Sequence, residues 1–255
     1  MLLDAWRLAV GTLTAVRLAP PREVDRRVAG RAMVLAPLAV LPLGAAVTLV
    51  AVAGHRLRLP LLVVALLGLG VLVLGNRAFH LDGLSDTADG LAASYDRERS
   101  LAVMKGGSAG PAGVAAVVLV LMLQASALVG ILEEPRWGRA AVLAGVAVCV
   151  SRAALVLCCA RGVVPARPDG LGVTYTQTVS RPIALVVWIV AAAVLAATSA
   201  WTGLPWWRGV LSAAVAVIVV VALLGRATRR FGGVTGDVFG ASIEVALAAC
   251  WVVLS

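Results

Sequence analysis

Three aspartates occur within the stretch HLDGLSDTADG, which directly follows a long apolar run. If the helix of that run continues past Phe79, Asp82, Asp86 and Asp89 share one narrow face, because each helical residue advances by about 100°. Carboxylates held so close repel one another, and oxygen-only ligand sets favour Mg²⁺, Mn²⁺ or Ca²⁺ over zinc. The pattern therefore predicts a divalent-metal site, with a solvated acidic loop as the alternative.

A second polar stretch, FGGVTGDVFG, covers residues 231–240 and opens the last apolar segment of the chain. Its glycines leave room for backbone N–H groups to meet an anion, and the N-terminus of a following helix favours negative charge. Gly233 and Thr235 are therefore candidate substrate contacts. Asp237 is a candidate fourth metal ligand.

Two charged residues fall inside apolar segments, where ionisable side chains are costly and are functional candidates by default. Glu244 lies seven residues after Asp237, near the same helical face, and Arg152 lies in an earlier apolar segment. We expect the two to be partners. They are either part of a substrate site or a buried structural pair.

A third polar stretch is MKGGSAGPAG, residues 104–113, in which Lys105 and Ser108 could contact phosphate. It does not match the nucleotide-binding P-loop pattern, and a plain connecting loop is an equal alternative. His80 precedes the acids and could ligate a metal, bind substrate or accept a proton, although a structural role is the more frequent one. The polar segment 166–182 either lines a site or forms an ordinary loop.

The composition indicates an integral membrane protein. Hydrophobic residues make up 61% of the chain, charged residues only 14%, and the mean hydropathy is +0.99, whereas soluble domains are about a quarter charged. Seven stretches approach the ~20 apolar residues that cross a bilayer: 32–53, 61–79, 111–132, 140–160, 183–201, 209–225 and 240–254. We expect an all-α polytopic membrane helix bundle, in a single domain spanning residues 1–255.

The first 18 residues differ from these stretches. Leu2, Leu3, Trp6, Val10 and Leu13 recur at three-to-four spacing. This spacing predicts an N-terminal amphipathic helix on the membrane surface.

Basic residues indicate how the chain is oriented. They alternate between richer and poorer loops, with 16 on one side and 5 on the other. The positive-inside rule then places the N-terminus and the long polar segments at the cytoplasmic face of the cell membrane. This bias explains the net charge of +9 without nucleic acid, since no basic stripe interleaves with aromatic residues.

Acids that hold divalent metal beside glycine-rich anion pockets suit phosphoryl transfer, in which positioning and charge stabilisation supply most of the catalysis. HLDGLSDTADG, MKGGSAGPAG and RFGGVTGDVFGASIE, in this order and with the N-terminal TAVRLAPP, resemble the adenosylcobinamide-GDP ribazoletransferase (cobalamin synthase) family over nearly the whole chain.

The resemblance implies that adenosylcobinamide-GDP is joined to α-ribazole or its 5′-phosphate with release of GMP, and that Mg²⁺ is required. It implies that Asp82, Asp86, Asp89 and Asp237 hold this metal against the diphosphate as catalytic residues. One departure is Gly106, where the family commonly carries Asp after a Met-Lys or Met-Arg pair.

Two other functions stay open at this point. The layout of the acids is similar in logic to that of CDP-alcohol phosphotransferases, which make phospholipids. A multi-pass transporter using Arg152 and Glu244 as an intramembrane relay is the non-enzymatic alternative, although polar residues gather at one face rather than mid-membrane. The sequence does not determine the oligomeric state, and a homo-oligomer is compatible with it.

Overall fold

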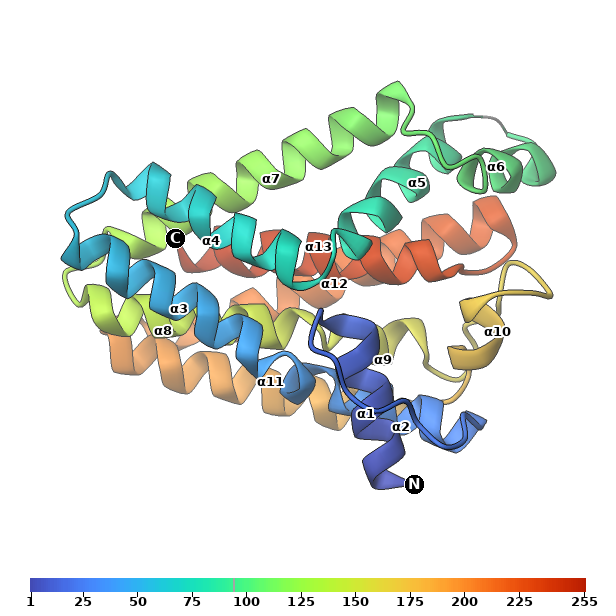
Figure 1. Cartoon of the computed structure of the whole chain (residues 1–255), viewed down its shortest axis with the longest axis horizontal. Coiled ribbons are helices and arrows are strands. Elements are labelled where there is room, and N and C mark those ends of the chain that lie inside the picture. The colour runs from blue at the N-terminus through green and yellow to red at the C-terminus, as the bar shows by residue number, and fades with distance from the viewer. Residues whose placement is uncertain (94) are drawn as a thin grey trace.

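The computed structural model describes residues 1–93 and 95–255, and every regular element within them is an α-helix (Figure 1). The helices are α1 (Leu2–Leu13), α2 (Arg26–Ala39), α3 (Leu41–Arg56), α4 (Leu61–Gly75), α5 (Phe79–Ala93), α6 (Arg97–Met104), α7 (Pro111–Leu132), α8 (Trp137–Ser151), α9 (Ala154–Cys158), α10 (Leu171–Tyr175), α11 (Arg181–Thr202), α12 (Trp206–Phe231) and α13 (Gly236–Leu254).

Six helical stretches in the described part of the chain are long and apolar enough to cross a membrane. They are Arg26–Arg56 (α2 with α3), Trp137–Cys158 (α8 with α9), α7, α11, α12 and α13. The pair α4 and α5, bent by 90°, would be a seventh. The chain is therefore the all-α, multi-pass membrane bundle that its composition predicts.

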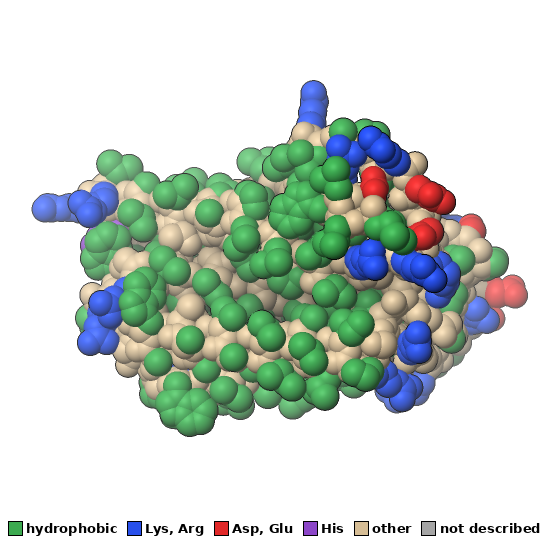
Figure 2. All heavy atoms as spheres, turned by 90° about the horizontal axis from the view of Figure 1, so that it is seen from below, with side chains coloured by type: hydrophobic (Ala, Val, Ile, Leu, Met, Phe, Trp, Pro, Cys, Tyr) green, Lys and Arg blue, Asp and Glu red, His purple; other side chains and the backbone are tan. Residues whose placement is uncertain are grey.

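Charge divides the bundle along its length. On the face shown in Figure 2, acidic side chains gather among basic ones at one end, basic side chains alone mark the other end, and apolar side chains cover the middle. The end that carries the acids holds α6, α10 and the start of α13 (Figure 1). Helix α13 is largely buried, with 72% of its apolar stretch inside the protein, whereas the buried share is 28% in α7 and α11 and 33% in α12. The acids therefore lie where the central helix begins.

The expectation that the second span continues straight into the acidic stretch is wrong. Helix α4 ends at Gly75, and the chain turns by 90° before α5 begins. Arg77 and Ala78 adopt left-handed backbone conformations, with φ of 60° and 57°. The N-terminal segment holds this turn, because the Arg77 guanidinium donates to Gly11 O (3.0 Å) and Ala15 N donates to Gly75 O (2.6 Å).

Two other expected spans contain breaks. The first span is interrupted at Val40, between α2 and α3, and begins at Arg26 rather than at residue 32. The expected span 140–160 is interrupted at Arg152 and Ala153, between α8 and α9. Both breaks are local turns, and the length of an apolar run does not predict such turns.

The expected N-terminal helix is confirmed as α1, but its apolar face is divided. Val10 and Leu13 are buried together with Ala5 and Ala9, and α1 packs on α2. Leu2 and Leu3 are 67% and 59% exposed. Part of the predicted lipid-facing stripe is therefore used for contacts within the protein.

Candidate active site

Helices α5 and α13 touch through two glycines. A β-carbon on Gly83 of α5 would lie 2.6 Å from the backbone oxygen of Asp237, and one on Gly240 of α13 would lie 3.0 Å from the backbone oxygen of His80. A β-carbon at 2.6 Å from a backbone oxygen would force the helices to shift, and one at 3.0 Å would be very tight. The glycines therefore let the two backbones approach closely at the end of the bundle that carries the acids.

This contact brings aspartates from two separate motifs together. The negative charges of Asp82, Asp89 and Asp237 all act on Asp86, and the positive charge of Arg167 opposes them. Asp82 is exposed, and Asp86 and Asp237 are partly exposed, so their carboxylates are accessible to a ligand. The acids of α5 and α13 therefore lie near enough for their charges to interact.

These acids are not a preassembled metal cage. Within residues 1–93 and 95–255, no three His, Cys, Asp or Glu side chains lie close enough to hold one metal ion. Magnesium in proteins is commonly held by one or two carboxylates, with substrate phosphates and water completing its octahedral shell. The exposed oxygen donors of Asp82, Asp86 and Asp237 fit that mode of binding.

Asp89, which the sequence grouped with the metal ligands, has other partners in the structure. Its two carboxylate oxygens accept hydrogen bonds from Gly110 N (2.7 Å) and Gly113 N (2.8 Å). Both donors lie at the start of α7, whose first N–H groups lack intrahelical partners. The side chain is buried, at 7% exposure. Asp89 therefore fixes the glycine-rich segment and the start of α7 against α5.

A cavity of about 180 Å³ adjoins the N-terminus of α13. It is lined by Arg167, Asp169, Gly170, Leu171, Gly172, Val234, Thr235, Gly236 and Asp237. Thr235 is 6% exposed, and its hydroxyl lies beside the carboxylate of Asp237. A buried hydroxyl and the free N–H groups of a helix start are both suited to an anion.

Gly233 has a different role from the predicted one. A β-carbon there would lie 2.5 Å from Val164 O, because residues 164–166 pair with the chain just before α13. Ala166 N donates to Val234 O, and Val234 N donates to Val164 O, both at 2.9 Å. Gly233 therefore permits this pairing, which holds the following loop beside the cavity.

Arg167 is the site residue that the sequence did not single out. It lines the cavity, its Nη2 donates to Leu101 O (2.5 Å), and its Nε is buried without a partner among the described residues. The only signal was its place in the polar segment 166–182, which did not separate a site from a loop. The structure shows that this segment lines the cavity.

The two candidates from the third motif lie at the edge of the site. Lys105 Nζ contacts Asp169 Oδ2 at 3.2 Å, and this hydrogen bond keeps the pKa of Asp169 below its ordinary value. Asp169 itself lines the cavity. Ser108 is exposed. Lys105 is thus connected to the cavity through Asp169.

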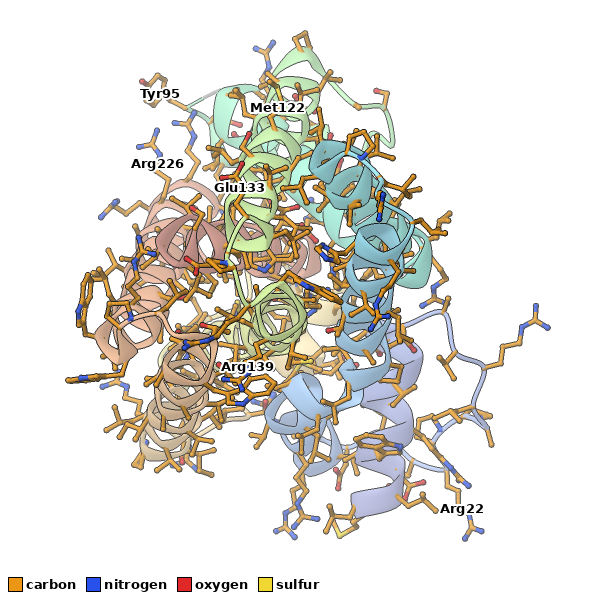
Figure 3. All side chains as sticks on the ribbon, turned by 90° about the vertical axis from the view of Figure 1, so that its left-hand side faces the viewer. Arg22, Tyr95, Met122, Glu133, Arg139 and Arg226 are labelled. Carbon is orange, nitrogen blue, oxygen red and sulfur yellow. The ribbon has the colours of Figure 1, made fainter. Side chains whose placement is uncertain are left out.

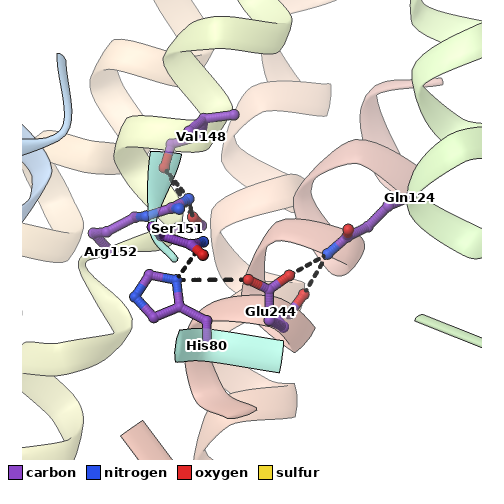
Figure 4. Close-up of polar contacts among 7 residues, drawn as sticks. His80, Gln124, Val148, Ser151, Arg152 and Glu244 are labelled. Carbon is purple, nitrogen blue, oxygen red and sulfur yellow. Dashed lines mark hydrogen bonds and ion pairs between the residues drawn. The ribbon is translucent and has the colours of Figure 1, made fainter. Parts of the chain in front are cut away.

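Two of the remaining candidates, His80 and Glu244, belong to a buried network, shown in Figure 4. Glu244 accepts a hydrogen bond from Gln124 Nε2 (2.9 Å) and lies 3.6 Å from His80 Nδ1. His80 also contacts Asn76 at 3.2 Å. His80 is therefore directed into the helix bundle, where it connects α5 to α13.

The expected Arg152–Glu244 pair is not formed. The Arg152 guanidinium instead donates to Val148 O and Ser151 Oγ, both at 2.9 Å, and its Nε and Nη2 lack partners among the described residues. The neutral Gln124 takes the place expected for the arginine. A lone glutamine within an apolar span was the available signal, since such residues commonly bond across helices.

The model of the family described as cobalamin-5-phosphate synthase matches residues 5–255. The chain belongs to this family. Cobalamin-5-phosphate synthases are enzymes, so the chain is a transferase of cobalamin synthesis and not a transporter. No solved structure matches the chain.

Several relatives are named adenosylcobinamide-GDP ribazoletransferase. One from a Nocardioides species is 51% identical over 246 residues, covering 96% of both chains. One from Frankia casuarinae is 38% identical and covers 100% of this chain and 95% of its own. One from Chlorobaculum tepidum is 32% identical over 98% of this chain and 94% of its own.

Proposed function

We propose that this protein transfers the adenosylcobinamide-phosphate group of adenosylcobinamide-GDP to α-ribazole or α-ribazole 5′-phosphate. The acceptor hydroxyl oxygen forms a bond to the phosphorus next to cobinamide and releases its proton, the bond from that phosphorus to the bridging oxygen of GMP breaks, and GMP leaves with that oxygen. Family membership supports the reaction. The observation that carries the site is the glycine contact between α5 and α13, which gathers acids from two motifs beside an anion-suited cavity.

We propose that Mg²⁺ would bind among Asp82, Asp86 and Asp237, with one or two of these carboxylates as direct ligands and with the donor diphosphate and water completing its shell. When bound, Mg²⁺ would neutralise charge on the diphosphate and on the leaving GMP. The accessible carboxylates support this assignment, and so does their mutual repulsion, which a cation would relieve. Asp89 has a positioning role in this scheme, because both of its oxygens already hold the start of α7.

The cavity at the start of α13 would bind a phosphate of the donor. Thr235 offers its hydroxyl, Arg167 offers its guanidinium, and the first N–H groups of α13 face a negatively charged group favourably. These contacts orient the diphosphate so that the reacting phosphorus faces the acceptor. Catalysis then depends chiefly on positioning and charge stabilisation.

We further propose that the protein lies in the cell membrane, that this end of the bundle faces the cytoplasm, and that the N-terminus is on the cytoplasmic side. The loops that gather here are the ones richer in basic residues, as the positive-inside rule requires of cytoplasmic loops. A water-soluble nucleotide donor would then reach the acids without crossing the bilayer.

The direct test of the activity is product formation by the purified protein in detergent micelles. With Mg²⁺, adenosylcobinamide-GDP and α-ribazole, we expect adenosylcobalamin and GMP in equal amounts, measured by chromatography. A parallel reaction with CDP-activated alcohols should yield no product. Absence of GMP release under conditions in which the Nocardioides relative is active would refute the proposal, as would efficient use of the CDP-activated alcohols.

A further inference from the structure

A second candidate ligand site is a groove on the outside of the bundle, and none of the acids of α5 and α13 lines it. The groove, of about 470 Å³, runs between α1, α2 and the start of α11. Its lining is Leu2, Arg27, Gly30, Arg31, Val34, Leu35, Thr178, Val179 and Ile183. Its charged residues are both arginines, and the rest of its lining is mostly apolar.

The two arginines are unpaired and close together. Arg27 and Arg31 are four residues apart on α2, so their side chains lie on the same helix face. Both are exposed, and neither forms a hydrogen bond or ion pair with another residue in the described part of the chain. The neighbouring Arg26, by contrast, donates to Thr176 O at 2.9 Å. Two free guanidiniums at one groove indicate an anionic ligand.

The apolar part of the groove continues along the membrane-facing surface. Val34 and Leu35 follow Arg31 by one helical turn towards the middle of the bundle. On the facing helix, Ile183, Leu185 and Val186 are 47%, 62% and 57% exposed. Both helices belong to stretches able to cross a membrane. The groove thus joins a positive entrance to an apolar path.

We propose that this groove binds an anionic phospholipid, with its phosphate at Arg27 and Arg31 and one acyl chain along Leu35 and Ile183. A basic pocket between helices at the membrane boundary suits a charged headgroup, and the apolar continuation suits a lipid tail rather than a free anion. The lipid would also contact Thr178 and Val179, in the segment whose other part, Leu171 and Gly172, lines the phosphate cavity.

The test compares two double variants of the full-length protein in micelles. Titration with phosphatidylglycerol, followed by the midpoint of thermal unfolding and by native mass spectrometry, should show binding to the wild type. The variant Arg27→Gln with Arg31→Gln should bind about 25-fold more weakly, at about fivefold for each arginine. The control, Arg226→Gln with Arg229→Gln, removes equal charge from α12 at the same end of the bundle. Figure 3 shows Arg226 on the opposite side of the bundle from Arg22.

Each further outcome decides the proposal. Equal weakening in both double variants would overturn it, because the effect would then be one of general surface charge. Weakening in neither would also overturn it, because Arg27 and Arg31 would then not hold the lipid. Stabilisation by inorganic phosphate as strong as that by the lipid would also overturn it in favour of a free anion. If the double variant fails to fold, phosphatidylglycerol with a photoreactive acyl chain, bound to the wild type, should cross-link to Leu35 or Ile183. Cross-links confined to other helices would contradict the site.

Discussion

The carboxylate of Asp86 has three negatively charged neighbours and one positively charged neighbour, Arg167. Asp82 and Asp89 lie on its own helix, and Asp237 approaches from α13. The sequence could predict that these acids cluster, because their spacing fits one helix face. It could not separate their roles, since the partners of Asp89 lie 21 and 24 residues further along the chain.

Replacing Asp86 with Asn keeps the size of the side chain and removes its charge. We expect Asp86→Asn to lower the rate of GMP release by at least about 100-fold, because loss of even an outer partner of a metal site costs about 10–100-fold. The matched control is Glu98→Gln, an exposed acid at the same end of the bundle. Circular dichroism should show both variants folded, and full activity of Asp86→Asn would exclude the metal role.

Asp89→Asn should lower the stability of the protein and leave its Mg²⁺ requirement nearly unchanged. The Asn side chain can accept only one of the two backbone hydrogen bonds, so we expect the free energy of unfolding to fall by about 1.5–3 kcal/mol, measured by denaturation in micelles. The Mg²⁺ concentration that gives half-maximal activity should stay close to that of the wild type. A variant of normal stability with a strongly raised Mg²⁺ requirement would show that Asp89 is a metal ligand after all.

At the scale of elements, the lengths of the apolar runs predicted most of the spans but not their breaks. The turn between α4 and α5 uses left-handed conformations at Arg77 and Ala78. Gly75, the last residue of α4, was a turn signal, but it lay inside the apolar run that predicted the span. The glycines at 83 and 240 were visible in the sequence, but their tight contact depends on two helices that are distant along the chain. Contacts between segments that are distant in the sequence therefore determine the turn and the helix spacing, and local sequence signals do not predict them.

The glycine contact yields its own prediction. In Gly83→Ala the new β-carbon would meet the backbone of Asp237, so α5 and α13 must separate, and overpacking of this kind costs about 1–3 kcal/mol. We expect a loss of GMP release out of proportion to the loss of thermal stability. Gly70→Ala on α4 is the control, because a β-carbon there meets nothing within 4 Å. Equal, near-normal activity of the two variants would mean that the spacing of the helices is unimportant.

At the scale of the whole molecule, the acids of α5 and α13 and the cavity at the start of α13 lie at the same end of the bundle. This polarity predicts which loops face the cytoplasm. In intact cells, a membrane-impermeant thiol reagent should label Arg58→Cys, between α3 and α4, and should not label Glu98→Cys at the start of α6. The native cysteines are buried or half-buried, so their background should be low. The reverse labelling pattern would invert the proposed orientation.

The most direct test of the account is Mg²⁺ uptake in the presence of adenosylcobinamide-GDP and without acceptor, measured by calorimetry after subtraction of a protein-free titration. We predict saturable binding to the wild type and to Glu98→Gln, weakened at least about tenfold in Asp82→Asn, Asp86→Asn and Asp237→Asn. Equal Mg²⁺ binding by the wild type and by all three aspartate variants would contradict the claim that acids from α5 and α13 together hold the metal.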